Sequence, residues 1–358
     1  MAGKNQHILP QFLLKGFASK SRGDDVWAWM YRRGQVAFEQ KVKEINAERY
    51  FYGKEGEISV DNQITTLESE YATFVRGLRA EQDRSKIVDP RIGSLVAHLN
   101  YRSKHLRQSL RESTEYLLDE ILEYLSDFDN FKDALLRDPS FLQNELRNLL
   151  EAATTATDAQ KNMLIEFVGL YAPSLFDENR TELESKMREL FVGVRKILPQ
   201  AVKEGHIKAL VKDPSPGNRA KEYSRLNWFI RHTEDPMILG DSGCLFETFN
   251  KRTFKPFSDK GDKIANLFLP IETHRVLVGT SFAGVPEVDV VTLNKAIAKC
   301  SHEYFVCSEA SPFNNSLSSS IGLWAGIISQ TELVELASEL IRDIQVGLLS
   351  GRRIISET

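Results

Sequence analysis

The residues best suited to chemistry gather in one stretch of the chain, residues 76–111. This stretch carries nine basic and three acidic residues, although the whole chain has a formal net charge of −4. The basic residues are Arg76, Arg79, Arg84, Lys86, Arg91, Arg102, Lys104, Arg107 and Arg111. A local excess of positive charge attracts phosphate and other anions. We therefore treat this stretch as a candidate anion-binding site.

Helical geometry divides these side chains into two groups. If residues 92–111 form one helix that advances about 100° per residue, the helix has a single apolar face. That face would consist of Leu95, Leu99, Leu106 and Leu110. The opposite face, which we expect to be solvated, carries Lys104, Arg107 and Arg111.

Three polar residues, His98, Arg102 and His105, fall instead along the edge of the apolar face. A guanidinium at that border needs a carboxylate or an anionic ligand, because its burial without a partner is costly. Two interpretations stay open. One is a structural pair of Arg102 with a carboxylate, flanked by two hydrogen-bonded histidines, and the other is a site for a phosphate or carboxylate ligand.

A second candidate is His7, which stands three residues before Pro10. Proline disfavours helical backbone at the residue before it, so we expect His7 in an extended segment held by Phe12 and Phe17. A histidine anchored in this way is a candidate acid, base or ligand. The alternative is a hydrogen-bonded packing residue.

The segment Gly240-Asp241-Ser242-Gly243 matches the nucleophile signature of trypsin-like proteases, but its context is wrong for that chemistry. A serine-protease triad needs a histidine base and a buried aspartate set earlier in a double β-barrel, whereas a long helical region precedes this motif. We expect a turn in which Asp241 lies at the end of a sheet, where it would pair with Arg102 or bind a metal. The chain has no GxxxxGK[ST] loop and no HExxH motif.

Two β-rich regions and one helical region must position these residues. VWAWMY at 26–31 and VAF at 36–38 flank a glycine-containing turn and predict a β-hairpin. Scarce glycine and helical apolar spacing predict several consecutive helices over residues 91–205. These helices are punctuated by Pro139, Pro173 and Pro199. Short β-rich segments follow from about residue 226.

A last helix is predicted near the C-terminal end of the chain, where Ser329 and Glu332 have the spacing of a capping box. The order of elements indicates an α+β fold: an N-terminal β-hairpin and C-terminal β segments around a central multi-helix region, predominantly helical. We expect an N-terminal part over 1–90, a helical region over 91–212 and a C-terminal α+β part over 213–358. We favour one sheet shared by the first and third parts.

Composition and hydropathy exclude several classes of protein. The chain is 42% hydrophobic and 27% charged, which argues against a disordered chain, a collagen-like fibre and a strongly basic nucleic-acid-coating protein. No apolar run reaches the 18 residues of a spanning helix, and the first residues lack the apolar segment of a secretory signal. Three cysteines without a CxxC pair fit a reducing compartment. We therefore expect a cytoplasmic protein that does not bind membranes.

Several of these segments together resemble an uncharacterised, mainly bacterial family, the domain of unknown function 4238. The opening pattern is carried by His7, Pro10, Phe12, Leu13 and Phe17. Six further segments are similar to the corresponding segments of the family. They are the Trp27 hairpin, residues 49–52, Glu68 in a helix, Tyr101-Arg102, the turn at 240–243 and residues 294–307. Gly240 departs from the small hydroxyl residue that the family has before the aspartate, and Gly243, not proline, stands two positions after that aspartate. The resemblance implies an architecture more than a reaction.

Three hypotheses follow for the function, and the sequence does not decide whether the protein is an enzyme. The first is a phosphodiester hydrolase acting on RNA or DNA, a nuclease-like effector in bacterial or phage defence. Arg102 would bind the phosphate, and His7, His98 or His105 would serve as acid or base. Asp241 and Glu68 would orient a histidine or hold a divalent metal.

The second hypothesis is a non-enzymatic interaction protein. Its acidic helical middle would face a protein partner, and Glu68, Arg102, His7 and Asp241 would form a buried network. The third is a sensor of a small anion. The hypotheses differ in whether the ligand is a nucleic acid, another phosphate-bearing molecule or a protein.

Overall fold

The computed structural model describes residues 5–7, 9–45, 47–49, 51, 59–137, 139–153, 156–249, 253–259 and 261–346. The chain divides into two compact units, which we call the first unit (residues 1–111 and 201–327) and the second unit (residues 112–200 and 328–358). The three-part division expected from the sequence, with borders after residues 90 and 212, stays a prediction.

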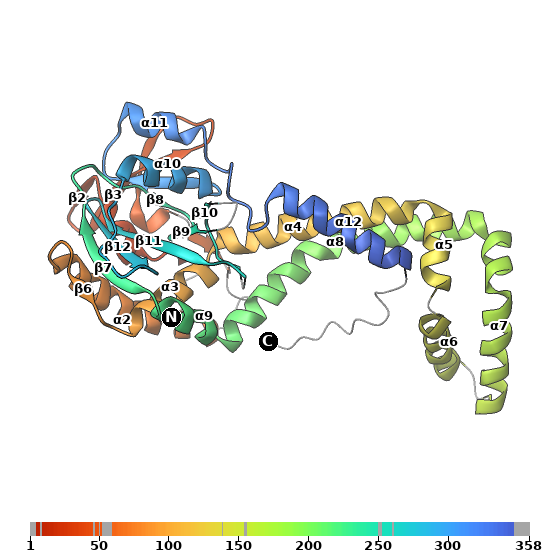
Figure 1. Cartoon of the computed structure of the whole chain (residues 1–358). Helices are drawn as coiled ribbons and strands as arrows, with labels where there is room; N and C mark the ends of the chain where they lie inside the picture. Colours follow the sequence, from red (N-terminus) through yellow and green to blue (C-terminus); the bar gives the residue numbers. More distant parts are fainter. Residues whose placement is uncertain are drawn as a thin grey trace. The chain divides into compact units, whose positions relative to one another are not determined.

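The first unit contains an antiparallel sheet with the strand order β10-β9-β11-β12-β7-β6 (Figure 1). Its strands are β6 (Lys86–Ile87), β7 (Asn227–His232), β9 (Leu245–Thr248), β10 (Phe254–Lys255), β11 (Ile264–Glu272) and β12 (Arg275–Thr280). The hairpin of β11 and β12 forms the middle of the sheet and places Leu269 opposite Leu277. Both side chains are fully buried, so this hairpin contributes directly to the core.

A second antiparallel sheet joins strands from distant parts of the chain in the order β2-β3-β13-β8, with β4 also paired to β3. Its strands are β2 (Lys20–Arg22), β3 (Asp25–Arg32), β4 (Phe38–Lys41), β8 (Leu239–Gly240) and β13 (Tyr304–Cys307). The pairing of β3 with β4 confirms the predicted hairpin. Its second strand begins at Phe38, after an exposed Val36. β13 lies against β3, and the ring of Phe305 stacks on Tyr31 at a centroid distance of 4.9 Å.

The remaining elements of the first unit are a small sheet and short or medium helices. β1 (Asn5–His7) pairs with β5 (Ala47–Arg49). The helices are α1 (Gln11–Leu14), η1 (Lys15–Phe17), η2 (Val42–Glu44), α2 (Ser59–Ala80), α3 (Arg91–Tyr101), α9 (Gly217–Ser224), α10 (Val290–Cys300) and α11 (Pro312–Ser318).

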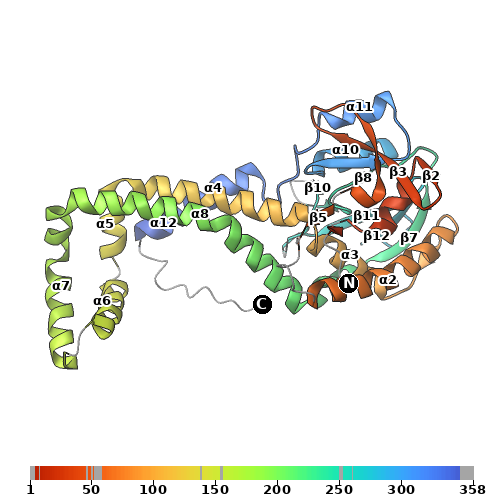
Figure 2. The same cartoon turned by 180° about the vertical axis from the view of Figure 1, so that it is seen from behind.

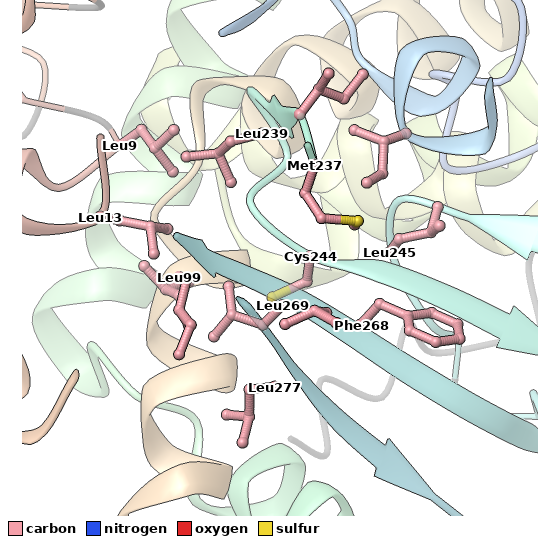
Figure 3. Packing of buried hydrophobic residues seen from close by; sticks show 14 of the residues in the cluster. Leu9, Leu13, Leu99, Met237, Leu239, Cys244, Leu245, Phe268, Leu269 and Leu277 are labelled. Carbon is pink, nitrogen blue, oxygen red and sulfur yellow. The ribbon is translucent and has the colours of Figure 1, made fainter. Parts of the chain in front are cut away.

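One large apolar core packs these helices against the sheets. Figure 3 labels Leu9, Leu13, Leu99, Met237, Leu239, Cys244, Leu245, Phe268, Leu269 and Leu277. Each of these side chains is at most 4% exposed, and burying a side chain of this size stabilises a fold by about 1.5–3 kcal/mol. Leu99 belongs to α3, so the core fixes the end of α3 and the residues that follow it.

The helix expected over residues 92–111 is interrupted, and the prediction of one continuous helix is wrong. α3 ends before Ser103, and α4 (Lys104–Ser126) begins after it. The Ser103 hydroxyl donates to the Asn100 carbonyl and accepts from the Leu106 amide, each at 3.0 Å. Serine favours helix starts because its side chain satisfies amides that the first turn leaves unbonded.

The break changes which side chains are buried. Leu95 and Leu99 lie in the core as expected, but Leu110 is 41% exposed. Arg107, expected in solvent, is 9% exposed. Residues after Ser103 belong to a new helix with its own buried face, so a single helical wheel does not describe both segments.

The second unit is helical in the residues that the structure describes. It contains most of α4, part of α8 (Arg180–Lys212), and α5 (Phe128–Leu136), α6 (Pro139–Ala153), α7 (Asp158–Glu178) and α12 (Gln330–Val346). The consecutive helices predicted over 91–205 are confirmed. Pro173 and Pro199 lie inside α7 and α8 rather than between helices. The predicted capping box is present, since the amides of Ser329 and Glu332 bond each other's side chains at 2.8 and 3.2 Å.

The fold is therefore α+β and predominantly helical, as predicted from the sequence. Within the described residues, no helix combines the length and the apolar character needed to span a membrane.

Two helical glycines give opposite predictions for stability. A Cβ on Gly93 of α3 would lie 2.1 Å from the Ser224 hydroxyl and 2.2 Å from the Ala220 carbonyl in α9, whereas a Cβ on exposed Gly77 of α2 meets no atom within 4 Å. We expect Gly93→Ala to lower the free energy of unfolding by about 1–3 kcal/mol through overpacking. Gly77→Ala should raise it by about 0.5–1 kcal/mol. Denaturant unfolding of both variants measures this difference, and equal effects would contradict the close α3–α9 packing.

Candidate functional site

A buried ion pair lies where α3 ends. The Arg102 side chain is 1% exposed and its guanidinium pairs with the carboxylate of Glu68 on α2, which is 26% exposed. The arginine remains charged at any physiological pH, so a permanent positive charge is held inside the protein next to a carboxylate that reaches solvent. The structure thus brings together two of the residues that the sequence analysis selected.

His98 completes this cluster on the other side of Arg102. Its Nε2 lies 3.2 Å from Arg102 Nη1, and its Nδ1 lies 3.1 Å from the Pro214 carbonyl oxygen. A guanidinium only donates and a carbonyl only accepts, so Nε2 accepts from Arg102 and Nδ1 carries the proton. Burial, helped by the charge of Arg102, lowers the pKa of His98 to about 3. His98 is therefore neutral, with one tautomer fixed by its two neighbours.

A second arginine and histidine repeat this arrangement. Arg107 Nε donates to His206 Nδ1 at 2.8 Å, and His206 Nε2 donates to the Tyr101 carbonyl at 2.7 Å. Burial and the charge of Arg107 lower the pKa of His206 to about 4. Arg107 also donates to the Phe51 carbonyl at 3.0 Å and lies over the Phe51 ring, 3.6 Å from its centroid.

Neither member of this second pair is predicted as a site residue by the sequence. Arg107 was assigned to the solvated face of a continuous helix, and His206 lies 99 residues away from it in α8. No local spacing connects them. The common feature that identifies them is structural: a buried arginine, a neutral histidine and a backbone carbonyl in one chain of hydrogen bonds.

Asp241 lies in the turn after β8 and binds backbone amides. Its carboxylate accepts from the amides of His302 at 2.8 Å, Glu303 at 2.6 Å and Tyr304 at 3.2 Å. Burial raises the pKa of Asp241 to about 6, although these amides oppose that shift. Asp241 therefore fixes the turn that leads into β13.

His105 of α4 lies next to this carboxylate. Its Nδ1 is 3.7 Å from Asp241 Oδ1, and its Nε2 donates to the Ala325 carbonyl at 2.6 Å. The ring also contacts Phe257 and His302, at centroid distances of 4.9 and 5.3 Å. His105 therefore lies between the Asp241 carboxylate and the Ala325 carbonyl.

Further polar side chains of α4 bond the turn that Asp241 binds. Glu303 pairs with Lys104 at 3.0 Å and accepts from the Gln108 amide at 2.8 Å. These contacts hold the start of α4 to residues 302–304. Burial would raise the pKa of Glu303, but the contacts with Gln108 and Lys104 outweigh it and lower that pKa. Asp241, His105 and Glu303 therefore connect α4 with the turn after β8 and with the start of β13.

The predicted site residues thus fall into two clusters. Glu68, Arg102 and His98 form one, and His105 with Asp241 forms the other. The carboxylate paired with Arg102 is Glu68, whereas Asp241 binds backbone amides. The backbone of His7 pairs with Ala47 in the β1–β5 sheet, and its side chain lies outside the described residues. Among described residues, no three His, Cys, Asp or Glu side chains are placed to hold a metal ion.

Comparison with protein families places the chain in one of them. A family model described as "Protein of unknown function (DUF4238)" matches residues 5–310, a range that contains both clusters. Searches of the curated proteins and of the solved structures gave no match.

The two neutral histidines make stability depend on pH. Their folded pKa values, about 3 for His98 and about 4 for His206, lie below the value of about 6.5 expected for an unfolded chain. The unfolded chain therefore binds more protons. The contribution of the two histidines to stability is complete above pH 6.5 and is lost as the pH falls toward 4 for His206 and toward 3 for His98.

We expect His206→Gln to reduce this pH dependence. A glutamine amide has both the acceptor that Arg107 needs and the donor that the Tyr101 carbonyl needs, and it does not titrate. Between pH 6 and pH 4.5 the variant should lose about 1 kcal/mol per pH unit less stability than the wild type. Urea unfolding at several pH values measures the slope, and parallel curves would show that His206 is not the titrating group.

Proposed function

The chain belongs to the DUF4238 family of proteins of unknown function, and from its buried ionic cluster we propose that it is a phosphodiester-directed hydrolase. The proposal rests on one observation, the Arg102–Glu68 pair. Arg102 is a fixed cation with 1% exposure, and Glu68 is its carboxylate partner with 26% exposure. Attraction between charges grows as the surroundings become less polar, so the Arg102 guanidinium would strongly attract a phosphate that took the place of the Glu68 carboxylate beside it.

The two side chains suit complementary tasks in phosphodiester cleavage. Arg102 would bind a non-bridging phosphate oxygen and stabilise the charge that develops on it. Glu68 would accept the proton of the attacking hydroxyl, from water or from a ribose. His7 is the group that the sequence offers for protonating the leaving oxygen, and a divalent metal near Glu68 or Asp241 is a further part of this proposal that an assay must test.

We assign a positioning role to the buried histidines. Both ring nitrogens of His98 have partners, so His98 holds the guanidinium of Arg102 in one orientation. His105 and Asp241 hold residues 302–304 against α4. When neighbouring residues already hold a catalytic group in position, the reaction does not have to supply the entropy cost of orienting that group. The setting we favour is a nuclease-like effector of bacterial or phage defence that acts on nucleic acid in the cytoplasm.

Substitution of the ion pair tests the reaction. We expect the wild type to cleave a labelled RNA or DNA oligonucleotide, assayed with magnesium, with manganese and with a chelator. Glu68→Gln and Arg102→Lys should each lower the rate at least about 100-fold, a normal effect for loss of a general base or a charge-stabilising group. Arg76→Gln is the matched control, because Arg76 is an exposed member of the same basic stretch. An inactive wild type, or variants as active as the control, would refute the proposal.

A second candidate function is a non-enzymatic one, in which the cluster binds a small anion or only stabilises the fold. The observation that favours it is the near-complete burial of Arg102 together with the full hydrogen bonding of His98. Such a protein would present its helical region to a protein partner, or bind a phosphate-bearing ligand without converting it.

Stability measurements separate this candidate from the hydrolase. Arg102→Ala removes the partner of Glu68 and leaves a cavity, and we expect it to lower the free energy of unfolding by about 3 kcal/mol. An anion-binding protein should in addition show a higher melting temperature with inorganic phosphate, and Arg102→Lys should reduce that shift. A purely structural cluster predicts the loss of stability without any shift from phosphate, and an unchanged stability of Arg102→Ala would contradict both.

A further inference from the structure

α7 of the second unit is apolar on two separate faces. Ile165 and Ala172 are at most 4% exposed on one face, where the helix packs against α6 and α5 (Figures 1 and 2). A second set of apolar side chains is exposed. This α7 stripe consists of Met163 (72% exposed), Leu164 (46%), Phe167 (57%), Leu170 (74%), Tyr171 (47%) and Leu175 (40%).

The spacing of the α7 stripe makes it a continuous surface. At about 100° per residue, its six side chains fall within an arc of roughly 140° that runs the length of the helix. The rings of Phe167 and Tyr171 touch at its centre, 4.6 Å apart. Helices normally bury their apolar faces against a partner, and the α7 stripe is exposed while Ile165 and Ala172 are buried.

Four of the six residues of the α7 stripe are placed symmetrically about residue 169. Met163 and Leu175 lie six residues before and after this point, and Phe167 and Tyr171 lie two residues before and after it. A second copy of the helix running in the opposite direction would therefore place Phe167 beside Tyr171 twice, and Met163 beside Leu175 twice. Two-fold dimers require a surface that is complementary to itself in this way.

Charge also favours the antiparallel direction. Within the arc, the charged residue of α7 is Glu178 at its C-terminal end, and the position equivalent to it at the N-terminal end is Gln160. Antiparallel helices would bring Glu178 beside the Gln160 amide of the other copy, which is able to donate to a carboxylate. Parallel helices would bring the two Glu178 carboxylates together, and like charges repel.

We propose that two copies of this chain pair through the α7 stripe, with their α7 helices antiparallel. The arc contains no lysine or arginine, which argues against a nucleic acid or an anionic membrane as its partner. An interface of this size is near the lower limit for specific association, about 1,000 Å² in total. The dimer should therefore dissociate in the micromolar range, and it is independent of the proposed hydrolase activity.

Sedimentation of the full-length chain over a range of concentrations tests the pairing. We expect the mass to rise from one chain to two as the concentration increases. Phe167→Glu should raise the dissociation constant at least about 30-fold, as loss of a central interface residue does. Asn162→Glu is the matched control. It adds the same charge to the same helix outside the stripe, next to Arg147, which already bonds Asn162 at 2.9 Å. Circular dichroism confirms that both variants are folded.

Cysteine cross-linking tests the direction. Leu170 lies one position from the centre of symmetry, so the two copies of Leu170→Cys would be close enough to form a disulfide. The two copies of Met163→Cys would be about 18 Å apart along antiparallel helices, at a rise of 1.5 Å per residue. The three native cysteines are buried and should not interfere.

The proposal requires a concentration-dependent dimer that Phe167→Glu disrupts, together with cross-linking of Leu170→Cys and not of Met163→Cys. It is overturned by a single-chain mass at every concentration, or by a dimer that Phe167→Glu and Asn162→Glu affect equally. Cross-linking through Met163→Cys as readily as through Leu170→Cys would show parallel pairing and would equally overturn it.

Discussion

The positive charge of Arg102, held at 1% exposure where α3 ends, is the constraint on which the candidate site depends. Burying such a charge without compensation is costly, so the surrounding chain must supply acceptors from several directions. It does so with the Glu68 carboxylate and with a ring nitrogen of His98. Because these acceptors come from α2 and α3, the ion pair connects two helices that the chain forms in separate segments.

Neutral histidines also help the protein to accommodate buried arginine charges. His98 and His206 each accept an N–H from an arginine and donate their own N–H to a backbone carbonyl. A protonated ring could not accept from a guanidinium, and the positive charge of the neighbouring arginine opposes protonation. Burial, together with the charge of the arginines, thus keeps the histidines neutral, and the histidines orient the arginines. The result is a rigid group of charges, which suits the binding of an anion better than a flexible surface patch would.

The cluster around Asp241 uses a buried carboxylate and a histidine to fix the backbone where the chain enters β13. Its carboxylate accepts three consecutive amides of residues 302–304, where the chain enters β13. β13 pairs with β3 from the beginning of the chain and with β8. One buried carboxylate therefore supports the sheet that joins the two ends of the first unit, while His105 connects it to α4.

Regular local patterns in the sequence were sufficient to predict the α+β class, the hairpin of β3 and β4, the run of helices and the capping box of Ser329 and Glu332. Each of these depends on residues close together in the chain. The selection of Arg102 and His98 as members of one cluster also followed from local spacing, since they lie one helical turn apart. Glu68 was selected through a family resemblance and not through spacing, because its contact with Arg102 spans 34 residues.

What tertiary structure alone decided are the contacts between distant segments. The Ser103 hydroxyl bonds the Asn100 carbonyl and the Leu106 amide where one helix ends and the next begins. Because of this break, Arg107, expected at the surface, is a buried partner of His206. Pro173 and Pro199 lie inside α7 and α8, although proline normally ends or bends a helix. A sequence specifies which side chains need partners, such as a guanidinium at the edge of an apolar face. Only the folded chain, by bringing segments together to bury that face, determines which carboxylate, ring or carbonyl becomes the partner.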